Sequence, residues 1–523
     1  MFETIPVILK IGEIEKRIWG HRLYDEQDGI TTLLEFLCVL SDHSFDDQKP
    51  SSDTFNEKTY RLCDYQAPKR TLLRSLVFNN PYIDEIYTGV SDPWESWRNQ
   101  FVTDQSNRDV DGQNLLLKLN DLNALKGMFN EHGDKDDKES FENFASVIRL
   151  LRYSGVNVQS GKRWTSRFLF PWGRHCLFLE MDKNGKTSER RFFARNGELL
   201  FMMMTFADRR DELADLIRTK LLDARDDLDS IAKALTFGED CMHQVPGREC
   251  VLPVDLFEES RRRINLMCDD LIRIFNLPIP TADIVVHAAR CVSLNLFCYF
   301  LEQGRFAINK FGNLDHPLLR NVILCEALQK KTSDIRRISK DLYQKDSEQS
   351  FNAVSAVYNF YADSSKVARS DDDEDDLDNL DNLDNQQSSG AGDSLGRILQ
   401  SHKGHWGSSL FRFLGKDCGL VSKSCTNAFR YAPTDELIET LASVLVKDRR
   451  MLFSDFLKEA YDRYGFVFGE SEFMEAGVQD PSFIPDNSEL KANRIRLQNR
   501  LLGLGLLKSL SDGCEFVLNP YRA

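Results

Sequence analysis

The stretch "NRIRLQNRLLGLGLL", residues 493–507, has the pattern of an amphipathic helix that ends at glycine and runs on toward a strand. Successive residues of a helix are about 100° apart, so positions three, four and seven apart share a side. Four leucines meet this condition and predict the buried stripe: Leu490, Leu497, Leu501 and Leu504. The stretch therefore predicts a helix packed on a core by its leucine side.

A polar face adjoins the leucine stripe and carries Asn493, Arg496 and Arg500. Arginine donates through a planar fork and asparagine both donates and accepts, so such a face can bond base edges or phosphates. Lys491 lies elsewhere on the helix surface, and Lys508 follows the helix. We expect these five residues to contact nucleic acid.

The elements around this helix predict a C-terminal winged helix within residues 401–523. "APTDELIETLASVLV" (432–446) reads as a first helix capped by Thr434, and "MLF" (451–453) as a short strand. "SDFLKEAYDRYG" (454–465) is a second helix, capped by Ser454 and stopped by Gly465. The quoted helix and a hairpin complete the order. The extra residues 466–486 depart from the simplest winged helix.

Charge around the third helix supports two different uses of the module. Residues 488–508 carry a net charge of +4, but residues 430–523 as a whole carry −3. Domains dedicated to DNA are usually basic, and winged helices also serve as protein-docking modules. The sequence therefore leaves two interpretations open, which are contact with double-stranded DNA and docking to another protein.

The whole chain reads as a predominantly helical, multidomain α+β protein. Its 523 residues are 41% hydrophobic, which is enough for several cores. We predict five parts: an N-terminal α+β region (1–135), an α+β hairpin–helix domain (136–235), a helical domain (236–362), an acidic disordered linker (363–400) and the winged-helix-like domain (401–523).

The linker contains nine acidic residues between Asp371 and Asp384 and a Leu-Asp-Asn repeat. Such a segment buries too little apolar surface to offset the entropy of ordering it. It is either a solvated tether or an acidic decoy for a basic surface. Without these nine charges the formal net charge of −15 becomes −6, so much of the acidity is local.

Cysteine usage and hydropathy indicate a cytoplasmic protein. Most of the twelve cysteines lie in apolar runs, which is typical of buried thiols in a reducing compartment. The N-terminus lacks the features of a signal peptide, and no stretch approaches the roughly 20 apolar residues of a membrane span. We expect no membrane association.

Signatures of catalysis are mostly absent, so we expect no cofactor and no metal. "GVNVQSGKRW" (155–164) is one residue too long for a phosphate-binding loop. Two groups of cysteine and histidine, within 241–250 and 402–425, lack the usual zinc-ligand spacing. Glu180, Asp182 and Lys183 are nuclease-type residues in an unusual order, which keeps a divergent nuclease as a further alternative.

Four stretches resemble accessory proteins encoded with bacterial anti-phage and DNA-restriction systems. They are "RFLFPWG" (167–173), "RRFFARNGELLFMMM" (190–204), "DIRRISKDLY" (334–343) and "APTDELIETLASVLV" (432–446). The resemblance implies a non-enzymatic accessory or scaffold subunit that works beside an ATPase, nuclease or methyltransferase. Its winged helix would then contact DNA or a DNA-bound partner.

Overall fold

A computed structural model gives the fold of the chain. It describes residues 11–23, 28–47, 50–54, 57–68, 75–77, 80–84, 86, 90–104, 122–130, 137–157, 163–164, 173–177, 195–223, 227–235, 242–247, 249–312, 322–327, 334–364, 407–423, 428–510 and 513–522. The predicted acidic linker, residues 363–400, lies outside these ranges apart from its first two residues.

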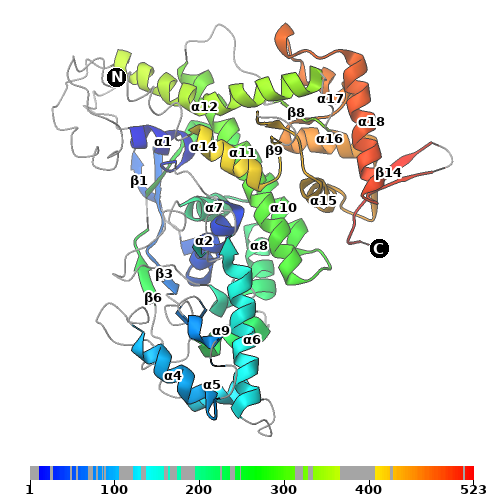
Figure 1. Ribbon diagram of the computed structural model, residues 1–523. Helices are drawn as coiled ribbons and strands as arrows, with labels where there is room; N and C mark the ends of the chain where they lie inside the picture. Colours follow the sequence, from blue (N-terminus) through cyan, green and yellow to red (C-terminus); the bar gives the residue numbers. More distant parts are fainter. Residues whose placement is uncertain are drawn as a thin grey trace, which may run out of the picture.

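The described residues form a predominantly helical α+β protein, as predicted (Figure 1). The helices are α1 (Ile11–Trp19), α2 (Gly29–Asp42), α4 (Pro93–Thr103), α5 (Leu122–Met128), α6 (Asp137–Gly155), α7 (Asn196–Thr205), α8 (Arg210–Ile217), α9 (Asp227–Leu235), α10 (Val254–Phe275), α11 (Thr281–Phe311), α12 (Asp334–Ser364), α14 (Gly407–Asp417), α15 (Asp435–Leu445), α16 (Phe453–Tyr464), α17 (Glu470–Ala476) and α18 (Asn487–Gly503). Short 3-10 turns include η7 (Arg174–Cys176) and η9 (Pro481–Phe483).

The strands are short, and they join parts of the chain that are far apart in sequence. They are β1 (Pro50–Thr54), β2 (Glu57–Arg61), β3 (Tyr65–Pro68), β4 (Val156–Asn157), β5 (Arg163–Trp164), β6 (Met242–Val245), β7 (Glu249–Pro253), β8 (Ile323–Leu324), β9 (Val421–Ser422), β10 (Arg430–Tyr431), β11 (Arg450–Leu452), β12 (Phe466–Val467), β13 (Leu507–Ser509) and β14 (Glu515–Leu518). β2 pairs antiparallel with β7, and β3 with β6. The N-terminal region therefore shares its sheets with residues 242–253.

Helix α11 is the centre of the fold. It packs against α2, α10, α12 and α14, because apolar side chains cover most of its circumference. Among the described helices it alone is long and apolar enough to cross a membrane, which the sequence analysis had not anticipated. However, 89% of its apolar window is buried inside the protein, as in a core helix.

Helices α2 and α7 cross in close contact at Gly197. A Cβ atom at this position would lie 2.6 Å from the backbone nitrogen of Phe36 and 2.6 Å from the backbone oxygen of Thr32. The lack of a side chain at Gly197 thus permits the crossing. The run of methionines in α7, residues 202–204, is buried in the same core.

Two large hydrophobic cores organise these elements. The larger extends from Ile14 to Val517, and the second joins α4, α5, α6, α9 and η7 around Trp94, Trp97 and Phe144. Figure 1 shows this second group at the lower end of the molecule. The division of the chain into five parts stays a prediction.

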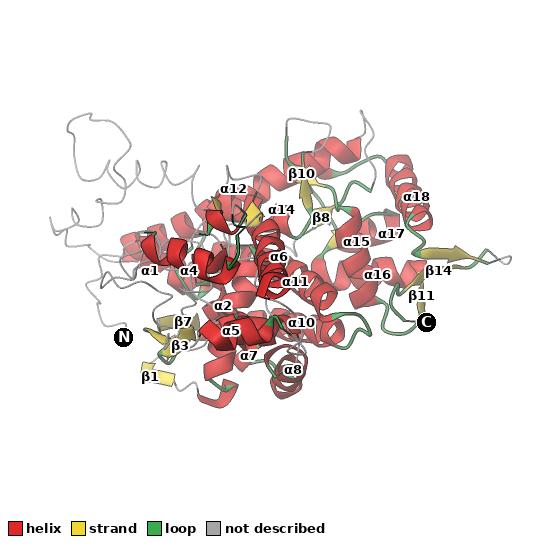
Figure 2. Cartoon of the chain, turned by 60° about the horizontal axis from the view of Figure 1, so that its bottom comes forward, coloured by secondary structure: helices red, strands yellow, loops and turns green. Residues whose placement is uncertain are grey.

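The C-terminal unit, residues 428–522, contains the predicted order of helix, strand, helix, helix and hairpin as α15, β11, α16, α18, β13 and β14. β14 lies between β11 and β13 in an antiparallel sheet. Thr434 accepts from the amide of Leu437 and Gly465 ends α16 with φ of 78°, both as predicted. The predicted Ser454 cap is wrong, since α16 already begins at Phe453. Both views place this unit at one end of the molecule (Figures 1 and 2).

Candidate interaction surface of the C-terminal unit

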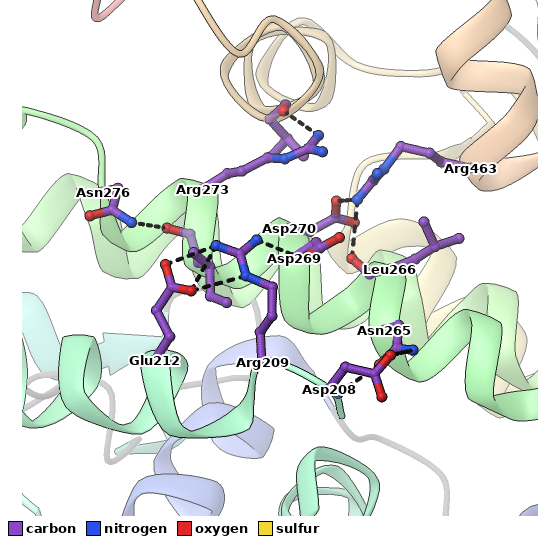
Figure 3. A network of polar contacts seen from close by, with 12 residues as sticks. Asp208, Arg209, Glu212, Asn265, Leu266, Asp269, Asp270, Arg273, Asn276 and Arg463 are labelled. Atoms are coloured by element: carbon purple, nitrogen blue, oxygen red, sulfur yellow. Dashed lines mark hydrogen bonds and ion pairs between the residues drawn. The ribbon is translucent and has the colours of Figure 1, made fainter. Parts of the chain in front are cut away.

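Buried ion pairs hold the C-terminal unit on the helical body. Figure 3 shows Arg463 of α16 reaching Asp270 of α10, where both side chains are almost fully buried. Tyr464 donates to the same carboxylate over 2.7 Å, and Asn295 of α11 donates over 3.1 Å. A buried carboxylate needs such donors because it has lost its hydration. The position of α16, and of the unit that it supports, is therefore fixed.

The segment around Tyr521 is anchored through His287 of α11. Its Nδ1 lies 2.8 Å from the hydroxyl of Thr440, and its Nε2 lies 2.9 Å from the hydroxyl of Tyr521. Burial, followed by the charge of Arg290, lowers the pKa of His287. Because Thr440 is only 2% exposed, this hydrogen-bonded chain serves to attach the C-terminus and offers no nucleophile to a substrate.

Segment 322–327 completes the C-terminal unit from outside its own sequence. β8 in this segment pairs in parallel with β12, which belongs to the additional residues between α16 and α18. The amide of Cys325 donates to Val467, and the amide of Glu326 donates to Tyr431. The C-terminal unit is thus joined to the helical body by backbone hydrogen bonds as well as by side chains.

Asn493, one of the residues predicted to contact nucleic acid, belongs to this junction. The side chain is fully buried. Its Nδ2 donates to the carbonyls of Cys325 and Phe468, each over 2.9 Å, and its Oδ1 accepts from the amide of Ala327 over 3.0 Å. An asparagine side chain both donates and accepts, so it can satisfy backbone groups of two segments at once. Asn493 has no surface left for a base.

Arg500, another of the predicted residues, lies on the same inward side. It donates to the carbonyls of Ala327 and Pro433 over 2.9 and 2.8 Å and pairs with Asp435 at 2.6 Å. Arg496 turns back along its own helix toward Glu489 at 3.6 Å, with 18% of its side chain exposed. Arg500 is thus bonded within the molecule, whereas Arg496 is largely covered and makes only this longer ion pair.

The outward side of α18 differs from the predicted face. It carries Lys491, Ile495, Asn499 and Leu502, which we call the outer face of α18; Ile495 and Leu502 are 42% and 41% exposed. Leu490, Leu497 and Leu501 are buried as predicted. Leu504 is 39% exposed instead of buried, because the helix ends at Gly503 and the side chain leaves the stripe.

The sheet beside α18 has an exposed row of its own. Leu452, Phe516 and Lys508 lie in one row across β11, β14 and β13, on the side opposite to buried Val517. Leu452 is 39% exposed and Lys508 is exposed. Gln498 of α18 donates to Glu515 of β14, which places the helix against the hairpin. Glu515 and buried Val517 share one side of β14, so α18 lies on that side and the exposed row lies on the other.

Other candidate sites contribute little to the described structure. Within residues 155–164 the described strands β4 and β5 pair antiparallel, and residues 158–162 between them lie outside the described part of the chain. Glu180, Asp182 and Lys183 lie outside the described residues, as do both histidines of the second proposed zinc group. Within the part of the chain that is described, no three His, Cys, Asp or Glu side chains gather to hold a metal.

A buried carboxyl pair in the central core was not anticipated from the sequence. Glu35 of α2 accepts from the amide of Gly197, and Glu198 accepts from Tyr65 and Arg195. Burial, together with the nearby charge of Glu198, raises the pKa of Glu35 well above its ordinary value. The pair caps the first turn of α7 from within the core, so it holds the crossing of α2 and α7 together.

No family model matches the chain, and neither a curated protein nor a solved structure matches it. Its function must therefore be inferred from its own residues.

Proposed function

We propose that the chain is a non-enzymatic scaffold subunit whose C-terminal unit, a winged helix, docks onto another protein. The exposure of Ile495 and Leu502 on the outer face of α18 carries this proposal. Apolar side chains that stay open to water at the helix next to the hairpin gain free energy when a partner covers them. The inward orientation of Asn493 and Arg500 supports docking over base readout.

The arrangement of elements supports the winged-helix assignment. α15, β11, α16, α18, β13 and β14 follow one another in the order of that module, and β14 lies between the other two strands. α18 holds the place of the helix that reads the major groove in DNA-binding members. In this chain the same helix presents isoleucine and leucine outward, which suits a protein surface.

The charges around the outer face indicate the kind of partner. Lys491 and Lys508 are exposed, and Arg494 is 38% exposed with only a distant carboxylate, that of Glu470 at 3.9 Å. A complementary surface has apolar side chains at its centre and acidic side chains at its rim. The resemblance to anti-phage accessory proteins suggests an ATPase, nuclease or methyltransferase of such a system, in the cytoplasm.

Direct contact with double-stranded DNA is the second candidate. It is supported by Lys491 and Lys508, the two predicted residues that the fold leaves exposed. Lysines at these positions would contact phosphates and carry no sequence information. Substitution of both by glutamate should then weaken duplex binding and reduce its dependence on salt.

The test uses the full chain and the purified products of genes encoded beside it. Ile495→Glu with Leu502→Glu places two charges in the apolar centre, and we expect binding of the partner to weaken by about 100-fold. Leu150→Glu is the matched control, because Leu150 of α6 is 66% exposed and far from the surface in sequence. A double variant that binds every such partner as tightly as the Leu150→Glu chain would refute the proposal.

A further inference from the structure

A second surface, away from the outer face of α18, gathers positive charge around an aromatic ring. Lys416 of α14 and Lys423 after β9 place their Nζ atoms 5.9 and 5.4 Å from the ring centre of Phe429. Tyr343 of α12 packs against the same ring, with 6.0 Å between ring centres. Arg412, one helical turn before Lys416, is also exposed. We call Arg412, Lys416 and Lys423 the cationic patch.

The cationic patch lacks a counter-charge in the described part of the chain. No ion pair between described residues involves Arg412, Lys416 or Lys423, although all three are exposed. The neighbouring carboxylate of Asp417 is used elsewhere, because it accepts from the amide of Gly29 at 2.8 Å and from the hydroxyl of Ser293 at 2.7 Å. Three like charges in such proximity favour an anionic ligand.

The chain itself carries an anionic segment next to the cationic patch in sequence. α12 ends at Ser364 and α14 begins at Gly407, and these two helices pack against each other (Figure 1). Residues 371–384, with their nine carboxylates, lie between them in sequence. We propose that residues 371–384 bind the cationic patch of the same chain.

Chain length allows this contact with a wide margin. Twenty-two residues separate Asp384 from Gly407 and can span at most about 79 Å. Gly407 and Lys416 are nine residues apart on one helix, which corresponds to about 14 Å. A tether of this length gives the segment an effective concentration of order millimolar at the patch. The intramolecular contact is thereby favoured over binding of a free anion.

Occupation of the patch by this segment has a functional consequence. A cluster of lysine and arginine beside an aromatic ring attracts nucleic acid through phosphate contacts and cation–π contacts. The acidic segment offers carboxylates to the same three cations, so it takes the place of a polyanion there.

Zero-length carbodiimide cross-linking of the full chain, read by mass spectrometry, tests the proposal. The reagent joins carboxylates to lysine amines in direct contact. We expect Lys416 to cross-link to residues 371–384 at least about fivefold more than exposed Lys458 does. Arg412→Glu with Lys423→Glu should reduce the yield at Lys416 to the level of Lys458. Lys447→Glu with Arg449→Glu, on the exposed turn before β11, is the matched control and should leave the yield unchanged.

Three results would overturn the proposal. One is equal yield at Lys416 and Lys458, and another is cross-linking between ¹⁵N-labelled and unlabelled chains in a mixture, which would assign the segment to a second copy. The third is an unlinked Lys416 combined with binding of duplex DNA that Arg412→Glu with Lys423→Glu abolishes. That result would assign the patch to nucleic acid.

Discussion

Replacement of Asn493 by alanine should destabilise the protein severely, although the residue lies on a charged helix near the C-terminus. The substitution removes three hydrogen bonds, to Cys325, Phe468 and Ala327, and leaves three backbone groups unsatisfied in a fully buried position. Each buried group left without a partner costs about 1–3 kcal/mol. We therefore expect the free energy of unfolding to fall by about 3–5 kcal/mol, near the upper end for single substitutions.

Urea denaturation, followed by circular dichroism, measures this loss. Asn493→Asp separates hydrogen bonding from packing, because aspartate has nearly the same shape but cannot donate to the carbonyls of Cys325 and Phe468. It should destabilise at least as much as alanine. Lys491→Ala is the control on the same helix, and its effect should stay within about 0.5 kcal/mol.

The reasoning would be refuted by an Asn493→Ala chain that unfolds within about 0.5 kcal/mol of the wild type. It would also be refuted by selective loss of duplex binding at unchanged stability. That second result is the one expected if Asn493 faced the solvent and contacted bases.

Three further predictions concern the cores. Gly197→Ala should lower the free energy of unfolding in urea by about 2–3 kcal/mol, because the added Cβ would clash with the backbone of α2. An unchanged denaturation midpoint would disprove this prediction. Arg463→Ala should cost about 3–5 kcal/mol by the same assay, since it leaves Asp270 buried beside neutral donors alone; a loss under 1 kcal/mol would contradict the buried pair. Burial raises the pKa of Glu15 to about 7, against the hydrogen bond from Leu23 and the charge of Arg22. The folded chain thus holds a proton that the unfolded chain has released, and stability falls by about 3 kcal/mol as the pH rises from about 4.5 to 7; Glu15→Gln should remove this slope in urea titrations across that range.

Local pattern in the sequence was sufficient for the elements of the C-terminal unit. Leucines at helical spacing predict the buried stripe of α18, and three of the four are buried. Thr434 and Gly465 fix helix ends through their own chemistry, so their roles follow from sequence alone. Leu504 was misjudged because helical periodicity stops where the helix does, at Gly503.

The candidate surface could not be predicted in the same way, because a second segment covers part of α18. Residues 322–327 lie more than 160 residues before Asn493 in sequence, and no local sequence pattern predicts that they pack against α18. Polar residues opposite a leucine stripe are usually solvated, so periodicity assigns Asn493 and Arg500 to the surface. In the fold, Asn493 and Arg500 satisfy backbone groups of that distant segment. The exposed side of α18 carries Ile495 and Leu502 instead.

The central claim is that α18 has an inward side bonded to residues 322–327 and an outward side free for a partner. Hydrogen exchange of residues 322–327 in the intact chain tests this claim most directly. The amides of Ile323, Cys325 and Glu326 donate to backbone oxygens, and that of Ala327 donates to Asn493. We predict that these amides exchange as slowly as the buried turns of α18, and that Asn493→Ala accelerates exchange at Ala327. Exchange of this segment within seconds, at the rate of an open loop, would contradict the claim and return Asn493 and Arg500 to the surface.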